Sequence, residues 1–275
     1  MFSRLVSNDE AIAKGSAFEA DEVQYNLFHR ITEGSDFLSC KTQDGKMMFA
    51  QTPGQSGWLW ISKEATAEER NDITQELVNH LNGVQLPGVT GEPETAALFA
   101  EAFSKKNHLQ YETEMAMESY YCPKVIKPVN VPGKIQAATL QDVDTVAEYL
   151  AGFLRDAFGT AVEPNTQTAK AETMIQTGNL YLWIVDDQPV SMANISHRSP
   201  RHARINSVFT PISHRKNGYA SALVAELCVI ISSENLVPML YADLKNPDSN
   251  KVYQNIGFLE SGKIAEFKFT DSPKR

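Results

Sequence analysis

The sequence contains little cysteine. Its 275 residues include only Cys40, Cys122 and Cys228, and none of them belongs to a C-x-x-C pair. Structural zinc sites and disulfide frameworks usually use cysteines in pairs, at characteristic spacings. We therefore expect neither a metal site nor a disulfide scaffold. Three isolated thiols are typical of a protein kept in a reducing compartment.

Excess positive charge and long apolar runs are also missing. The formal net charge is −9, whereas domains that bind nucleic acid usually carry a basic footprint. No apolar run approaches the roughly 20 residues needed to cross a membrane. The first residues, M-F-S-R-L-V-S-N-D-E-A-I-A-K-G, lack the apolar centre of a signal peptide. We expect a cytoplasmic protein that binds neither nucleic acid nor membrane.

Apolar residues are abundant enough for one large domain or two domains of average size. They make up 42% of the chain, and no segment has the composition of a disordered region. Residues 123–133 contain three prolines and few strong helix or strand formers, which indicates a linker. We predict a first domain over residues 1–122, a linker over 123–133 and a second domain over 134–275.

The first domain shows alternating helical and strand-like patterns. A strong hairpin signal, Asp44-Gly45, lies between strand-like residues 37–40 and 46–51. Apolar residues recur on one helical face in residues 21–31, 66–81 and 93–106. The predicted order is helix, hairpin, strand, helix, strand, helix, strand.

A basic turn rich in small residues opens a helix in the second domain. Strand-like residues 204–210 are followed by R-K-N-G-Y-A at residues 215–220 and by an apolar helix over 222–231. The first N–H groups of such a helix lack backbone partners and attract anions, and Gly218 allows close approach. The turn indicates a phosphate site, although the motif alone also fits an ordinary strand–helix connection.

A second set of signals follows. Residues 240–244 read as a strand, Asn246-Pro247 as the start of a helix, and Gly257 as its end. Ser249, Tyr253 and Ile256 lie at spacings that share one helical face. The sequence therefore predicts a helix that turns a hydroxyl and a phenol toward the same side.

Together, V-F-T-P, R-K-N-G-Y-A and N-P-D-S-N-K-V-Y-Q-N-I-G-F resemble the GNAT superfamily of acyl-CoA-dependent N-acetyltransferases. The resemblance extends from about residue 133 to the C-terminus. It implies an α/β fold (a mixed α+β sheet), with mostly antiparallel strands flanked by helices and a splayed pair of parallel strands in the C-terminal lobe. The element order of the first domain is nearly the same, so we predict a degenerate GNAT-like N-terminal lobe.

The first lobe differs at the position of its phosphate turn. Residues 66–72 contain no glycine, and Glu68 and Glu69 would repel a pyrophosphate. We do not expect this lobe to bind CoA in the same way.

The resemblance implies a role for each residue of the second lobe's motifs. Backbone groups of Val208, Phe209 and Thr210 would bind the amides of pantetheine in the gap between the splayed strands. The pyrophosphate would lie on Arg215, Lys216, Asn217, Gly218, Tyr219, Ala220 and Ser221. Asn246 and Ser249 would contact pantetheine from the other side, and Tyr253 would reach the thioester sulfur as the proton donor.

The general base is not identifiable from the sequence. No acidic residue lies within 204–210, where some members of the family carry one. Asp243 is the nearest acidic candidate along the chain, and a solvated or helix-capping carboxylate is the alternative reading.

These residues predict an acetyl-CoA-dependent N-acetyltransferase that acts on the primary amine of a small molecule or peptide. A non-catalytic acyl-CoA sensor or interaction module is the alternative. A nucleotide-binding protein is disfavoured, because G-x-x-x-x-G-K-[ST] and G-x-G-x-x-G are both missing. The amine, the acyl chain length and the oligomeric state stay open, and a homodimer is compatible with the sequence.

Overall fold

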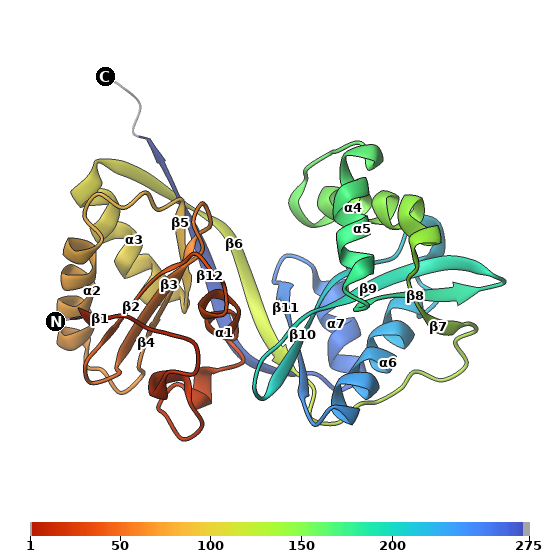
Figure 1. The fold of residues 1–275 in the computed structure, drawn as a ribbon, viewed down its shortest axis with the longest axis horizontal. Coiled ribbons are helices and arrows are strands. Elements are labelled where there is room, and N and C mark those ends of the chain that lie inside the picture. Colours follow the sequence, from red (N-terminus) through yellow and green to blue (C-terminus); the bar gives the residue numbers. More distant parts are fainter. Residues whose placement is uncertain (1, 272–275) are drawn as a thin grey trace. The chain divides into compact units, whose positions relative to one another are not determined.

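The computed structural model describes residues 2–271, which divide into two units (Figure 1). The first unit comprises Met1–Ser119 together with Ser261–Arg275, and the central unit comprises Tyr120–Glu260. The chain thus leaves the first unit once and returns to it. The central unit is built from one continuous stretch.

The first unit is a mixed sheet with helices packed against it. Its strands occur in the order β1, β2, β3, β4, β5, β12, β6. All the pairs from β1 to β4 are antiparallel, β4 and β5 are parallel, and β5 and β12 are antiparallel. The strands are β1 (Phe2–Ser3), β2 (Leu38–Thr42), β3 (Met47–Gln51), β4 (Gly57–Ile61), β5 (Gly88–Gly91), β6 (Leu109–Tyr121) and β12 (Leu259–Asp271). The helices are α1 (Leu27–Thr32), α2 (Ala67–His80) and α3 (Pro93–Asn107).

The C-terminal strand belongs to the first unit, whereas the sequence placed it in the second domain. In β12, Ala265 lies opposite Gly91 of β5, and Lys268 lies opposite Gly88. The Phe269 N–H donates to the carbonyl of Pro87 at 2.8 Å. These contacts join segments more than 150 residues apart, and no local pattern in the sequence indicates such a pairing.

The predicted linker is a strap packed on the central unit. Residues 123–133 contain no helix or strand. The Ile126 N–H donates to the carbonyl of Ile256 at 2.7 Å, and the indole N–H of Trp183 donates to the carbonyl of Pro132 at 2.9 Å. Val125 and Val131 pack against the buried core. We refer to residues 123–133 as the strap.

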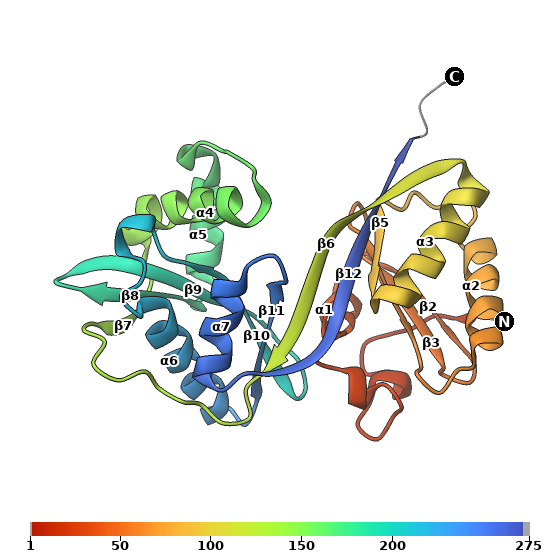
Figure 2. The ribbon, with the colours of Figure 1, turned by 180° about the vertical axis from the view of Figure 1, so that it is seen from behind.

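The central unit is a five-stranded sheet covered on both faces (Figures 1 and 2). Its strands follow the order β7, β8, β9, β10, β11, and only the β10–β11 pair is parallel. One core joins α4 and α5 to the sheet through residues such as Leu182 and Phe209. A second core joins α6 and α7 to the other face. The elements are β7 (Lys134–Ala137), α4 (Val143–Phe158), α5 (Thr168–Gln176), β8 (Leu180–Val185), β9 (Gln188–Arg198), β10 (His202–Phe209), α6 (Tyr219–Ser233), β11 (Val237–Asp243) and α7 (Pro247–Ile256).

The predicted fold class is confirmed. Mixed, mostly antiparallel sheets are flanked by helices, and the central unit contains a parallel pair. In the first unit, the order β4, α2, β5, α3 matches the order β10, α6, β11, α7 of the central unit. In each case a helix connects two parallel strands and a second helix follows. This correspondence fits a two-lobe fold.

Candidate active site

The parallel strands β10 and β11 pair over only a short distance. His202, Ala203 and Arg204 lie opposite Val237, Pro238 and Met239. Within the described chain the ladder ends at this third pair, although β10 continues to Phe209 and β11 to Asp243. The strands therefore form a fork whose edges can accept hydrogen bonds from an inserted extended group.

A bulge in β10 shapes one edge of this fork. Asn206 lies opposite Asn194 of β9, and Phe209 lies opposite Met192, so Ser207 and Val208 together stand opposite a single residue. Ser207 has φ of +51°, a left-handed conformation that is uncommon for serine. Such a bulge re-aims the strand next to it.

The three predicted pantetheine-binding residues lie on this edge but differ in environment. Val208 is half-buried, and its side chain packs against the core that also holds Tyr253. The ring of Phe209 packs on the opposite face, 5.6 Å from the ring of Tyr149 between centroids. The Thr210 carbonyl already accepts a hydrogen bond from Arg215. Because its ring packs on the opposite face, Phe209 could contact pantetheine only through its backbone.

The turn before α6 presents a row of amide donors. Gly218 has φ of +80° and is the N-cap residue of α6, with no side chain capping the helix. The first intrahelical bond runs from the Ala222 N–H to the Gly218 carbonyl. The N–H groups of Tyr219, Ala220 and Ser221 consequently precede the helical ladder and can donate to an anion.

Two side chains of the turn, those of Arg215 and Asn217, form hydrogen bonds with backbone carbonyls in or beside it. The Arg215 guanidinium donates to the Thr210 carbonyl at 2.9 Å and pairs with Asp156 of α4. The Asn217 amide nitrogen donates to the carbonyls of His214 and Arg215, each at 3.1 Å. Lys216 is exposed. The positive charge at the turn is thus carried by an exposed lysine and by an arginine already paired with a carboxylate.

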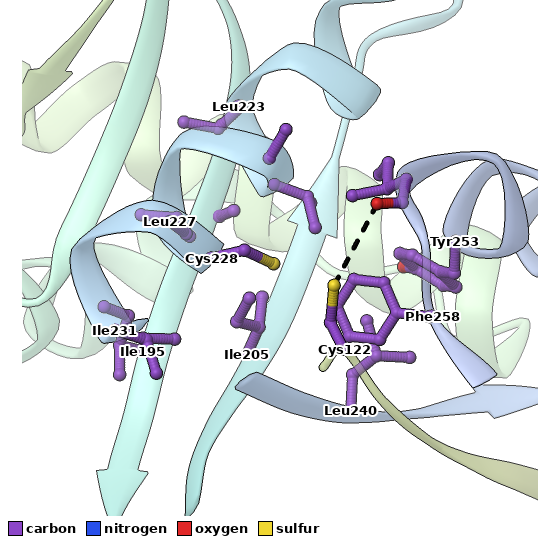
Figure 3. Close-up of a cluster of buried hydrophobic side chains, with 14 of the residues drawn as sticks. Cys122, Ile195, Ile205, Leu223, Leu227, Cys228, Ile231, Leu240, Tyr253 and Phe258 are labelled. Atoms are coloured by element: carbon purple, nitrogen blue, oxygen red, sulfur yellow. Dashed lines mark hydrogen bonds between the residues drawn. The ribbon is translucent and has the colours of Figure 1, made fainter. Parts of the chain in front are cut away.

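The side chain of Tyr253 extends from α7 into the buried core. Its side chain is 8% exposed, and its ring centroid is 5.8 Å from that of Phe258 (Figure 3) and 6.4 Å from that of Tyr120. Burial raises the pKa of Tyr253 to about 12. The phenol is therefore protonated at neutral pH, and its hydroxyl can donate a hydrogen bond.

The start of α7 is capped by one of the predicted ligands. The Asn246 side chain accepts a hydrogen bond from the Ser249 N–H at 3.1 Å. Pro247 occupies the first turn, and Gly257 ends the helix at φ of +105°. Ser249 is half-buried near the start of the helix. Among the described residues the Asn246 amide nitrogen makes no hydrogen bond, so it can contact a ligand.

The Asp243 carboxylate stabilises the turn between β11 and α7. Its Oδ1 accepts a hydrogen bond from the Lys245 N–H at 2.8 Å. The bond is local to the turn, and the cap of α7 itself is Asn246.

The fork, the turn and the phenol meet at one core. Val208 from β10, Tyr219 from the first turn of α6 and Tyr253 from α7 all pack against the same buried cluster. Sequence reasoning missed two further members of this region, Tyr120 and Asn250. Their hydroxyl and amide are bonded at 2.9 Å. Asn250 could have been noticed from its spacing to Tyr253, but nothing in the sequence links Tyr120 to α7.

The corresponding helix start in the first unit is closed by its own side chains. The Thr66 hydroxyl accepts from the Glu69 N–H at 3.2 Å, and the Glu69 carboxylate accepts from the Thr66 N–H at 2.7 Å. Lys46 donates to the same carboxylate at 2.8 Å and, with Thr66, lowers the pKa of Glu69 to about 2. A carboxylate thus occupies the place where an anion would bind.

Within residues 2–271, no helix is both long enough and apolar enough to span a bilayer. No cluster of three or more histidine, cysteine, aspartate or glutamate side chains in that range could hold a metal ion.

Comparisons with known proteins agree with this geometry. Residues 146–258 match the sequence model of the Acetyltransferase (GNAT) family. No curated protein matches the sequence. Three solved structures are similar in fold over nearly the whole chain. They are a GNAT-family acetyltransferase from Colwellia psychrerythraea, a GCN5-related N-acetyltransferase from Sphaerobacter thermophilus and another from Kribbella flavida.

The sequence identities to these structures are low. The Colwellia protein is 12% identical with a TM-score of 0.57, and the match covers 98% of this chain and 100% of that chain. The Sphaerobacter protein is 15% identical with a TM-score of 0.60, covering 100% and 98%. The Kribbella protein is 11% identical with a TM-score of 0.57, covering 96% and 98%. The likeness to these three is one of fold, whereas the family match lies in the sequence and supports acetyl transfer in general. The stretch that matches the acetyltransferase (GNAT) family model, residues 146–258, includes the fork, the turn and Tyr253.

Proposed function

We propose that the central unit transfers an acetyl group from acetyl-CoA to the primary amine of a small molecule or peptide, by direct attack of the amine on the thioester. The observation that carries this proposal is the convergence of Val208, Tyr219 and Tyr253 on one core. An open strand pair, an uncapped helix start and a protonated phenol suit the three parts of the donor.

The donor's binding groups match the donors and acceptors available. The pyrophosphate takes the N–H groups of Tyr219, Ala220 and Ser221, with Lys216 adding charge. The pantetheine amides pair with the backbone of β10 at the fork. The amide nitrogen of Asn246 and the hydroxyl of Ser249 contact the pantetheine from the side of α7.

In the proposed reaction, Tyr253 acts on the sulfur that leaves as the thioester is attacked. The amine nitrogen bonds to the thioester carbon, the carbon–sulfur bond breaks, and the sulfur keeps the electron pair. The proton lost by the nitrogen ends on the sulfur. A phenol with a pKa of about 12 is a weaker acid than a thiol of pKa ~8.5. Tyr253 therefore stabilises the departing sulfur mainly by donating a hydrogen bond, and relays a proton rather than supplying one of its own.

The competing function is a non-catalytic acyl-CoA sensor. The observation that favours it is the engagement of Asp243 in a turn, which leaves the nearest acidic candidate for a base committed elsewhere. Proton loss from the amine would then depend on water.

The test is release of CoA thiol from acetyl-CoA across a panel of polyamines, amino acids, aminoglycosides and lysine peptides. In Tyr253→Phe, kcat should fall about 100-fold, the range of a lost proton-transfer group, while the CoA dissociation constant measured by calorimetry stays near the wild-type value. Turnover should rise with pH as the amine loses its proton. Because the pKa of Tyr253 is about 12, the residue causes no decline between pH 7 and 10.

Tyr149→Phe is the matched control. Burial also raises the pKa of Tyr149 to about 12, but its hydroxyl donates to the carbonyl of Pro189. This variant should keep wild-type turnover. Unchanged turnover in Tyr253→Phe would remove the phenol from the mechanism, and tight CoA binding without thiol release on any amine would establish the sensor.

A further inference from the structure

Asn250 uses every polar atom of its side chain. Its amide nitrogen donates to the carbonyl of Asp243 at 2.8 Å and to that of Asn246 at 2.7 Å. Its amide oxygen accepts from the hydroxyl of Tyr120 at 2.9 Å. The opposite amide orientation would set an oxygen against two carbonyls, so the partners define the orientation. One side chain thus joins the end of β11, the start of α7 and the end of β6.

Tyr120 contacts α7 at two successive places. Its side chain is 2% exposed, and its ring is 6.4 Å from that of Tyr253 with an angle of 50° between the planes. Asn250 precedes Tyr253 by three residues, so both lie on the same face of the helix. The hydroxyl of Tyr120 therefore holds one turn of α7, and its ring supports the phenol on the next.

The Tyr253 side chain is held in place by ring packing. Among the described residues its hydroxyl makes no hydrogen bond, and its ring is held by packing against Tyr120 and Phe258. Its position then depends on the rotation of α7 about the helix axis. A displacement of about 1 Å at a reacting group can lower a rate by roughly 100-fold.

We propose that Tyr120 is a positioning residue for acetyl transfer. Through Asn250, its hydroxyl holds α7 in the rotation that aims the Tyr253 hydroxyl at the thioester sulfur. This inference rests on the proposed function, because it requires Tyr253 to act on that sulfur. It locates the effect of Tyr120 in the chemical step and not in CoA binding, since the pyrophosphate donors belong to α6.

Tyr120→Phe removes the hydroxyl and keeps the ring. Its kcat should fall about fivefold, the effect of one buried hydrogen bond, while the KM for acetyl-CoA and the CoA dissociation constant change by less than about twofold. Asn250→Ala should lower kcat at least as much. The double variant should be no slower than Asn250→Ala alone, because the hydroxyl acts through the amide.

Tyr121→Phe is the matched control. Tyr121 is the neighbouring, half-buried tyrosine of β6, and among the described residues its hydroxyl makes no hydrogen bond. This variant should retain wild-type kinetics. Hydrogen exchange supplies a readout that needs no turnover. The amides of α7 should exchange faster in Tyr120→Phe, and at the wild-type rate in Tyr121→Phe.

The outcomes separate the two proposals. If the wild type releases thiol with an amine but Tyr120→Phe keeps the wild-type kcat, the positioning role is overturned and the proposed function stands. Independent losses in Tyr120→Phe and Asn250→Ala that multiply in the double variant also overturn it. So does an equal weakening of CoA binding, which indicates a general structural effect. If the wild type acetylates nothing, the proposed function fails, and unchanged exchange in α7 then refutes the fastening as well.

Discussion

Gly218 combines a left-handed backbone conformation with a position beside the proposed pyrophosphate site. It has φ of +80°, and a Cβ placed on it would lie 3.0 Å from a Val131 methyl group of the strap. The left-handed conformation disfavours any side chain by roughly 1 kcal/mol, and Val131 leaves little room for one. The amides that follow Gly218 are those assigned to the pyrophosphate.

Gly218→Ala should therefore weaken CoA binding about tenfold, because a shift of the turn misaligns several charge-assisted hydrogen bonds at once. Isothermal calorimetry with CoA measures this directly. Gly178→Ala is the control, since Gly178 has φ of +69° with nothing within 4 Å of an added Cβ. It should lower the free energy of unfolding by a similar amount and leave CoA affinity intact. Equal affinities in the two variants would contradict the assignment of the turn.

At the scale of elements, the two corresponding helix starts have opposite chemistry. The first turn of α6 carries no side-chain cap, whereas Thr66 and Glu69 cap α2 reciprocally. A capped helix start has its donors satisfied by protein groups, and an uncapped one offers them to a ligand. This difference supports our proposal that an anion binds at the start of α6 and not at the start of α2.

Thr66→Ala should lower the free energy of unfolding by about 1 kcal/mol, the usual effect of losing an N-cap. Urea denaturation followed by circular dichroism measures the change. CoA affinity should stay at the wild-type level, because α2 is not expected to bind the donor. A weaker CoA complex in this variant would show that the first unit takes part in binding.

Local signals made the elements of the candidate site predictable. Asn246-Pro247 and Gly257 marked both ends of α7, and the structure places the helix at Pro247–Ile256 between them. Tertiary contacts were not predictable. The pairing of Arg215 with Asp156 joins residues 59 apart in the sequence, and that of Tyr120 with Asn250 joins residues 130 apart. The helix expected over residues 21–31 begins only at Leu27, and Asp21 instead ends a short 3-10 helix and contacts Trp60 and Lys63 from elsewhere in the chain.

At the scale of the whole molecule, the division into units could not be predicted from the sequence. Proline content in residues 123–133 suggested a linker, but these residues pack on the central unit. The return of β12 to β5 depends on strand pairing across most of the chain. The amino-acid composition of a segment indicates how stiff and how polar that segment is. It does not indicate which strands pair with one another.

Removal of β12 should therefore damage the first unit more than the central one. A chain ended after Glu260 exposes the edge of β5 and uncovers Phe103, whose ring lies 5.0 Å from that of Phe269. Amides of residues 38–107 should lose protection in hydrogen exchange, whereas those of α6 should keep it. Wild-type protection of β5 in the shortened chain would contradict the assignment of this strand.

The division of the chain also sets an order in time. Every residue of the central unit has been translated once Glu260 is added, whereas the unit made first still lacks residues 261–271, the greater part of β12. A nascent sheet cannot complete its core before all of its strands have emerged from the ribosome. The first unit therefore stays an unfinished intermediate, with one edge of β5 unpaired, until the strand that follows the whole central unit has been made.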